Sequence, residues 1–225
     1  MKTTIIFVRH GETETNKNKK LHKSDDPKEL NEVGRKQITK TAEELRKYSP
    51  NAIYSSKETR AIQSAEIISK ICGVELTKVD GLEERNWGDF SGKTWPEIQA
   101  VLDKLTLEER YNYLPPNGES WKSFDERLKS KLDEILQENE GKTIIVVSHG
   151  GAIRALMPHL LGVPKEESFK YDPDNASITT FEYENGKFIK KIVNDTSHLV
   201  ACTGHDTYET LREGLICDNS VFLEG

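Results

Sequence analysis

The sequence is poor in cysteine and has no long apolar run. Its 225 residues include three cysteines, Cys72, Cys202 and Cys217. They form no CxxC pair, and an odd number cannot close into a complete set of disulfides, which suits a reducing compartment. The longest apolar stretch near the N-terminus, Ile5 to Val8, is far too short for a signal sequence or a membrane span. We therefore expect a cytoplasmic protein that does not associate with membranes.

The sequence also lacks a basic stripe and a set of metal ligands. The formal net charge is −6 at pH 7, and lysines and arginines are spread among acidic residues. Nucleic-acid binding needs clustered positive charge, so we expect no nucleic-acid partner. No HExxH-like spacing occurs among His22, His159, His198 and His205, and the cysteines form no thiolate cluster. We therefore expect no catalytic metal and no cofactor.

The segments that are present predict an α/β fold. Three stretches rich in β-branched residues precede stretches that can form helices, which is typical of a parallel sheet. These strands are expected at Thr3–Val8, Ala52–Ser55 and Thr143–Ser148. Helices are expected at Glu32–Tyr48, Lys57–Cys72, Trp95–Leu102, Ser120–Glu138 and Ala152–Leu161, the last ended by Gly162 and Pro164. Continuous apolar runs suit strands buried on both faces, so we predict a three-layer α/β/α sandwich with a mostly parallel central sheet.

The end of the chain predicts an antiparallel edge followed by an extension. Ser177–Tyr183 and Lys187–Val193 flank an Asn-Gly pair, which favours a hairpin turn. We expect a single domain over residues 1–200 and a C-terminal extension over residues 201–225. In that extension Tyr208, Leu211, Leu215 and Ile216 have the spacing of a short amphipathic helix, although a disordered tail fits equally well. Residues 16–32 and 114–119 have the composition of loops.

Polar residues follow each of the first three predicted strands. Arg9-His10-Gly11 follows the first, Ser55-Ser56 leads to Arg60 after the second, and Ser148-His149-Gly150-Gly151 follows the third. Ligands of open α/β sheets bind beyond the carboxyl ends of the strands. We therefore expect two arginines and two histidines to meet at one edge of the sheet.

This set of side chains fits phosphoryl transfer. Arginine stays charged and binds phosphate oxygens in pairs. A neutral imidazole can attack phosphorus when an acceptor holds its other ring nitrogen, and Gly11 would let the backbone approach closely enough to do so. The leaving oxygen needs a proton, for which a nearby carboxyl group is the usual source. The candidates are Glu12, Glu83 and Glu84.

Four elements of the sequence resemble those of the histidine phosphatase superfamily, the phosphoglycerate mutase-like proteins. Phe7 to Thr13 reads Phe-Val-Arg-His-Gly-Glu-Thr and is similar to the family signature. Residues 55–65 resemble its second arginine element, residues 82–88 its acid element and residues 147–151 its second histidine element. The elements occur in the family's order and span most of the chain.

The resemblance implies a role for each matching residue. His10 would be the phosphorylated nucleophile and Glu84 the general acid. The phosphate pocket would consist of Arg9, Asn16, Arg60, His149 and the backbone N–H groups at Gly150. The loop at residues 117–120 resembles one that lines the site. The implied activity is hydrolysis of a small phosphorylated metabolite without a cofactor.

Several alternatives stay open at this stage. A phosphoglycerate mutase-type phosphotransferase would use the same residues, although mutases usually have a longer insertion than the one separating Glu84 from His149. A non-catalytic phospho-ligand module would lack the nucleophile or the acid. Arg60 would be an ordinary surface arginine if it paired with Glu58 or Glu66. The lysine-rich residues 17–30, with Lys17, Lys19, Lys20 and Lys23, are either a solvated loop or a binding surface for a second anionic group. The sequence leaves the oligomeric state open, a homodimer included.

Overall fold

The structure, a computed structural model, describes residues 1–18 and 29–199. Within these ranges one sheet contains β1 Thr3–Arg9, β2 Ala52–Ser56, β3 Leu76–Val79, β4 Thr143–Ser148, β5 Ile178–Glu184 and β6 Lys187–Asp195. The strand order is β3-β2-β4-β1-β5-β6. The first four strands in this order pair in parallel, and β5 is antiparallel to both β1 and β6. The mostly parallel sheet with an antiparallel hairpin at its edge is therefore confirmed.

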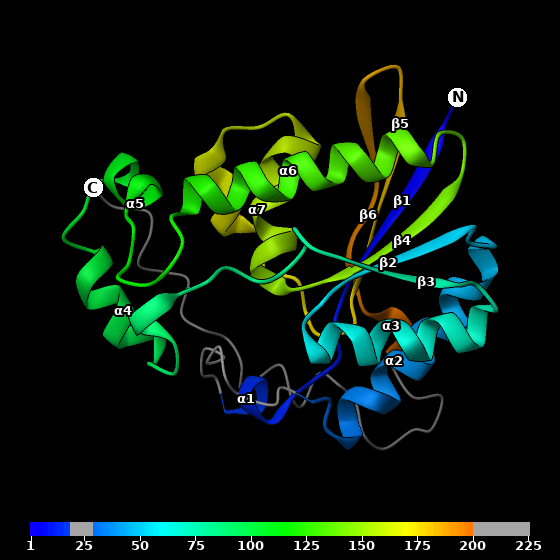
Figure 1. Cartoon of the computed structure of the whole chain (residues 1–225), viewed down its shortest axis with the longest axis horizontal. Helices are drawn as coiled ribbons and strands as arrows, with labels where there is room; N and C mark the ends of the chain where they lie inside the picture. Colours follow the sequence, from blue (N-terminus) through cyan, green and yellow to red (C-terminus); the bar gives the residue numbers. More distant parts are fainter. Residues whose placement is uncertain (19–28, 200–225) are drawn as a thin grey trace.

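Helices cover both faces of the sheet, as Figure 1 shows. The described helices are α1 Glu14–Lys17, α2 Glu32–Leu45, α3 Thr59–Cys72, α4 Trp95–Leu102, α5 Leu107–Asn112, α6 Trp121–Glu138 and α7 Gly150–Leu161. Short 3-10 turns occur at residues 46–48, 88–90, 165–170 and 197–199. α2 and α3 pack on one face, and α6 and α7 pack on the other. The predicted three-layer sandwich is thus confirmed.

Alternate residues of β1 point into two separate cores. Ile5 and Phe7 join the core under α6 and α7, whereas Ile6 and Val8 join the core under α2 and α3. This follows from the period-2 geometry of a strand, whose successive side chains point to opposite faces. β4 divides its Ile and Val side chains between the same two cores. The continuous apolar runs in the sequence therefore mark the strands at the centre of the sheet.

Three short elements escaped the sequence prediction. β3 is a four-residue strand at the sheet edge, and α1 is a four-residue helix. Segments of this length carry too few residues for a hydrophobic period to emerge. α5 had a local signal, because Thr106 and Glu109 form a capping box at its start. The predicted extension over residues 201–225 and the lysines at 19, 20 and 23 lie outside the described residues.

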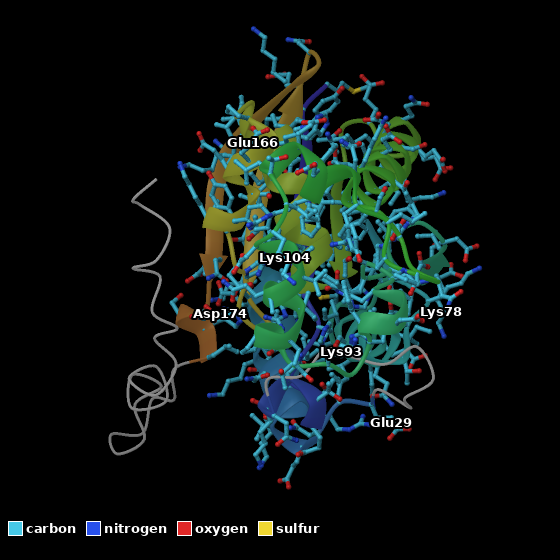
Figure 2. The ribbon with its side chains drawn as sticks, turned by 90° about the vertical axis from the view of Figure 1, so that its left-hand side faces the viewer. Glu29, Lys78, Lys93, Lys104, Glu166 and Asp174 are labelled. Atoms are coloured by element: carbon cyan, nitrogen blue, oxygen red, sulfur yellow. The ribbon has the colours of Figure 1, made fainter. Side chains whose placement is uncertain are left out.

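The described surface carries charge of both signs. Figure 2 labels acidic Glu29, Glu166 and Asp174 and basic Lys78, Lys93 and Lys104 among its side chains. The described helices include none with both the length and the apolar composition needed to cross a bilayer.

The strand register brings the polar residues after β1, β2 and β4 to one edge. Arg9 of β1 is paired with Ser148 of β4, and Ser55 of β2 is paired with Val147 of β4. All three strands run in parallel, so their carboxyl ends lie side by side. As expected, the two histidine elements and the second arginine element therefore lie together at this edge of the sheet.

Replacing Ile145 with alanine tests the importance of the central strand. Ile145 is fully buried in β4, so the change should lower the free energy of unfolding by about 2–5 kcal/mol. Urea denaturation measures this loss. The control is Ile189→Ala on β6, where the side chain is 46% exposed and the expected loss is about 1 kcal/mol or less. Equal losses for the two variants would contradict the assigned core.

Candidate active site

His10 lies directly after β1 and is held in one orientation. The residue is 2% exposed, and its backbone N–H donates to the Ser148 carbonyl at 3.0 Å. Its Nδ1 lies 2.8 Å from the Gly11 carbonyl oxygen, and its Nε2 lies 3.1 Å from Nε of Arg60. Because a guanidinium only donates and a carbonyl only accepts, this network assigns the proton to Nδ1 and the lone pair to Nε2. The imidazole therefore turns its unprotonated nitrogen, Nε2, towards Arg60.

The backbone at Gly11 packs closely against α2. A Cβ at residue 11 would lie 2.5 Å from the carbonyl oxygen of Gly34 at the start of α2. Only glycine permits this approach. The Gly11 N–H donates to Oγ of Ser64 on α3, at 3.2 Å. Gly11 thus joins the loop after β1 to both α2 and α3.

Arg60 is buried in the first turn of α3. Its side chain is 1% exposed and forms an ion pair with Glu58 in addition to its contact with His10. Burial lowers the pKa of Arg60, and the negative charges of Glu58 and Glu84 oppose that effect. The pairing with Glu58 considered from the sequence is present, but the surface position is wrong. Sequence reasoning did not recognise Glu58 as part of the site, since an acidic residue before a helix has many ordinary uses.

His149 faces His10 from the end of β4. Its ring centroid lies 5.3 Å from that of His10, and the residue is fully buried. Nε2 of His149 lies 2.7 Å from Oγ of Ser56, the last residue of β2. His149 is also the N-cap residue of α7, so Gly150 begins the first turn of that helix. The site therefore contains the positive end of a helix dipole as well as its side chains.

A loop before β5 contacts both Arg9 and His10. Nη1 of Arg9 donates to the Pro173 carbonyl at 2.6 Å, and Nδ2 of Asn175 donates to the His10 carbonyl at 3.0 Å. Burial lowers the pKa of Arg9, against the opposing charges of Asp172 and Glu84. Neither Pro173 nor Asn175 was a sequence candidate. The loop lies more than 160 residues from His10 along the chain, and its composition carries no signal for this contact.

Asn16 lies at the edge of this group. It belongs to the capping box of α1, in which the Thr13 backbone N–H donates to Oδ1 of Asn16 at 3.3 Å. Nδ2 of Asn175 also donates to this oxygen, at 3.3 Å. Asn16 is therefore linked through Asn175 to the backbone of His10.

The three candidate carboxyl groups occupy different surroundings. Oε1 of Glu12 accepts from Nδ2 of Asn31, and Oε2 of Glu83 accepts from the Gly81 N–H, both at 2.8 Å. Glu84 instead reaches the start of α7, where its Oε2 accepts from the Gly151 N–H at 2.9 Å. Glu84 is thus the one of the three that contacts the turn carrying His149.

Glu84 and the phosphate-pocket candidates are joined through Glu58. Oε1 of Glu58 accepts from the Glu84 N–H at 3.1 Å, and its other oxygen pairs with Arg60. Arg85, next along the chain, is 6% exposed and stacks over the rings of Trp87 and Trp121 at 4.3 and 5.4 Å. Burial lowers the pKa of Arg85 to about 10. Trp87 and Trp121 therefore pack against Arg85, next to Glu84.

The combined arrangement suits attack on a phosphoryl group. The imidazole of His10 lies beside Arg60 and faces the ring of His149, next to the N-terminus of α7, and the Glu84 carboxylate contacts the same helix turn at Gly151.

Comparison with known proteins identifies the family. The model of the histidine phosphatase superfamily (branch 1) matches residues 5–196. The chain belongs to the histidine phosphatase superfamily. This histidine phosphatase is 32% identical over 203 residues to an uncharacterized phosphatase, PhoE, of Bacillus subtilis, with 88% of the chain and 97% of the relative covered. It is also 32% identical over 203 residues to a metal-independent phosphoserine phosphatase of Arabidopsis thaliana, with 88% of the chain and 83% of the relative covered.

A solved structure agrees with these relatives. It contains a histidine-to-alanine mutant of phosphoserine phosphatase from Entamoeba histolytica in complex with phosphoserine. The histidine phosphatase matches it with a TM-score of 0.76 and 29% identity, covering 88% of this chain and 100% of the other. The predicted family and fold are confirmed, and the protein is a phosphatase that hydrolyses phosphomonoesters.

Replacing Gly151 with alanine tests the contact between Glu84 and α7. A Cβ at residue 151 would lie 2.3 Å from Oε1 of Glu84, so the carboxyl group must move. A displacement of about 1 Å at a reacting group can cost roughly 100-fold in rate, and we expect a fall in kcat of that order. Steady-state kinetics on a phosphomonoester measures it, with the thermal unfolding midpoint as the control for folding. Full activity in a folded Gly151→Ala protein would rule out the need for this contact.

Proposed function

We propose that this histidine phosphatase hydrolyses small phosphomonoesters through a phosphohistidine intermediate on His10. The orientation of His10 carries the proposal: Nδ1 is held by the Gly11 carbonyl and Nε2 faces Arg60. An imidazole in this tautomer is ready to attack without first losing a proton.

Two displacements at phosphorus make up the reaction. In the first, the lone pair on Nε2 of His10 forms a bond to phosphorus while the ester P–O bond breaks. Glu84, which is protonated in the complex with the anionic substrate, gives its proton to the leaving oxygen. In the second, a water molecule attacks the phosphohistidine, the P–N bond breaks, and Glu84 takes a proton from the water. Free phosphate leaves, and His10 and Glu84 return to their starting states.

The remaining residues hold the phosphoryl oxygens. Arg9 and Arg60 bind them as charged donors, and His149 and the N–H groups at Gly150 add further donors. Asn16 completes the pocket from the side of α1. These groups stabilise the charge that develops on the equatorial oxygens in the transition state.

Phosphoserine is the first substrate to test. The Arabidopsis relative is named a phosphoserine phosphatase, and the Entamoeba neighbour holds phosphoserine. The name of the Arabidopsis relative also supports a reaction that needs no metal. A phosphoglycerate mutase-type activity has less support from these relatives. The predicted cytoplasmic location, the absence of nucleic-acid and membrane partners, and a homodimer stay predictions.

Replacing His10 with alanine should abolish turnover. The variant loses the nucleophile, so release of inorganic phosphate from phosphoserine in the presence of EDTA should fall to the uncatalysed background, because nothing else at the site forms the covalent intermediate. The matched control is His159→Ala, since His159 is an exposed histidine on α7, packed against Phe188. Phosphate release that persists in a folded His10→Ala protein would contradict the phosphohistidine mechanism. If EDTA abolishes phosphate release by the unmodified protein, the reaction depends on a metal.

The products distinguish hydrolysis from phosphotransfer. With phosphoserine or 3-phosphoglycerate in water, we expect one free phosphate for each ester consumed, because water is the final acceptor in a phosphatase. Phosphate assay and phosphorus NMR of the same sample measure the two quantities. Isomerisation of the phosphoglycerate pool with little free phosphate would assign the protein to the mutases.

A further inference from the structure

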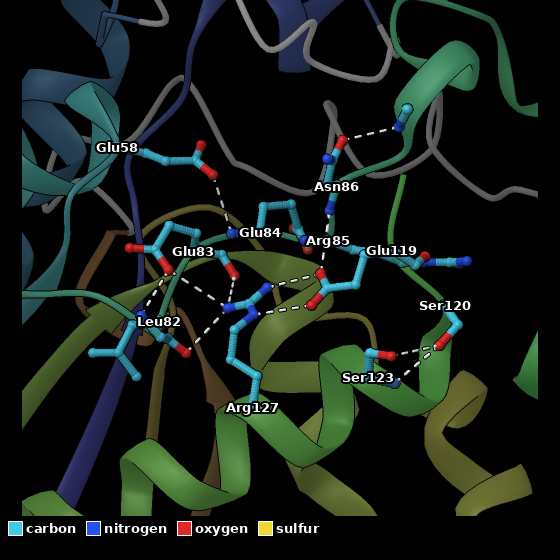
Figure 3. Close-up of polar contacts among 12 residues, drawn as sticks. Glu58, Leu82, Glu83, Glu84, Arg85, Asn86, Glu119, Ser120, Ser123 and Arg127 are labelled. Carbon is cyan, nitrogen blue, oxygen red and sulfur yellow. Dashed lines mark hydrogen bonds and ion pairs between the residues drawn. The ribbon is translucent and has the colours of Figure 1, made fainter. Parts of the chain in front are cut away.

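Arg127 lies on α6, outside the four sequence elements that carry the proposed catalytic groups. Its Nε and Nη2 donate to the two carboxylate oxygens of Glu119 at 3.0 and 2.9 Å. Its Nη1 donates to the carbonyl oxygens of Gly81 and Glu83 at 3.1 and 3.3 Å, and lies 3.5 Å from the Glu83 carboxylate. Figure 3 shows this guanidinium between the segment before Glu84 and the loop that ends at Ser120. All three of its nitrogens are therefore engaged by these two segments.

The same contacts hold the backbone on both sides of Glu84. Before it, Arg127 binds two carbonyl groups directly. After Glu84, the backbone is held by Glu119. The Glu119 N–H donates to the Asn86 carbonyl at 2.8 Å, and the Glu119 carboxylate accepts from the Asn86 N–H at 3.4 Å. The Glu119 carbonyl also accepts from Nε of Arg85 at 3.0 Å. Arg127 and its partner Glu119 thus fix residues 81–83 and 85–86 relative to α6.

Such fixing matters because the acid-bearing segment has no regular structure of its own. Residues 82–87 belong to neither a helix nor a strand. Besides its contacts with Arg127 and Glu119, this segment makes two further hydrogen bonds. The Leu82 carbonyl accepts from Oγ of Ser148 at 2.7 Å, and the Glu84 N–H donates to Glu58. A guanidinium supplies donors in a rigid plane, so one side chain can hold a carboxylate and two carbonyls at once.

Charge adds to the effect of geometry. Glu83, Glu84 and Glu119 lie close enough to Arg127 for all three to raise its pKa, which burial alone would lower. The net direction is upward, so Arg127 keeps its charge and offsets the mutual repulsion of these carboxylates. A neutral residue at this position would leave that repulsion in place.

We propose that Arg127 is a positioning residue for the general acid Glu84. It makes no hydrogen bond to the Glu84 carboxylate and acts by holding the backbone from which that side chain reaches the leaving oxygen. This inference rests on the proposed role of Glu84. Through Glu84, Arg127 would affect the protonation of the leaving group. It would not affect the binding of the phosphoryl group.

A pair of substrates that differ in leaving group tests this assignment. p-Nitrophenol is a far stronger acid than phenol, so p-nitrophenyl phosphate needs little help from a general acid and phenyl phosphate needs much more. In Arg127→Met we expect kcat for phenyl phosphate to fall by roughly 10-fold more than kcat for p-nitrophenyl phosphate. KM for both esters should stay within about threefold of the unmodified protein, because the phosphate pocket is untouched.

Matched variants separate positioning from general damage. Arg127→Lys keeps the charge but not the planar fork, so it should show the same selectivity to a smaller degree, and it provides the measurement if Arg127→Met does not fold. The control is Arg110→Met, because Arg110 also pairs with a carboxylate and a carbonyl, those of Asp103 and Leu105, away from the acid segment. It should leave both rates unchanged. Equal losses on the two esters, or no loss, in the Arg127 variants would overturn the proposal.

Glu84→Gln shows whether a failure belongs to Arg127 or to the acid. The Glu84→Gln variant alone should lower kcat for phenyl phosphate more than kcat for p-nitrophenyl phosphate. In the double variant with Arg127→Met, the rate on phenyl phosphate should fall no further than in Glu84→Gln alone, because the two residues act through one proton transfer. Selectivity in Glu84→Gln without selectivity in Arg127→Met would overturn the role of Arg127 only. Absence of selectivity in Glu84→Gln would overturn the role of Glu84, and this inference with it.

Discussion

The parallel pairing of β1 with β4 is the constraint on which the site depends. Arg9 and Ser148 are register partners, so the residues that follow them, His10 and His149, emerge next to each other at the same edge. The His10 N–H continues the ladder by donating to Ser148, and the two rings end 5.3 Å apart. A shift of either strand by one residue would exchange the side chains that point into the two cores, so the packing that stabilises the sheet also fixes the spacing of the histidines.

Charge compensation is the second requirement of this edge. Arg60 and Arg85 are 1% and 6% exposed, and burying a guanidinium is costly unless carboxylates lie nearby. Glu58 and Glu84 supply that negative charge to Arg60, and Glu119 and Glu84 supply it to Arg85. Charges of both signs therefore meet at this edge, where Glu58 contacts both Arg60 and the backbone N–H of Glu84.

Sequence reasoning predicted the parts of this site that follow a periodic signal. The apolar runs predicted β1 and β4, and the polar residues after them were placed at one edge because parallel strands share their carboxyl ends. The choice of Glu84 over Glu83 came from the resemblance to the family and not from spacing. Glu58, Asn175 and Arg127 were not predicted as site residues, since the apolar pattern of a segment does not show which distant segment its polar side chains will contact. Such contacts depend on tertiary packing alone.

The two helical layers contribute different halves of the candidate active site. α3, from the layer with α2, carries Arg60 beside His10, whereas α6 and α7, from the opposite layer, contact the segment around Glu84 through Arg127 and Gly151. The central sheet separates the two cores that support these halves. Substitutions on α6 and its loops can therefore change the surroundings of Glu84 without altering the separate core that supports Arg60.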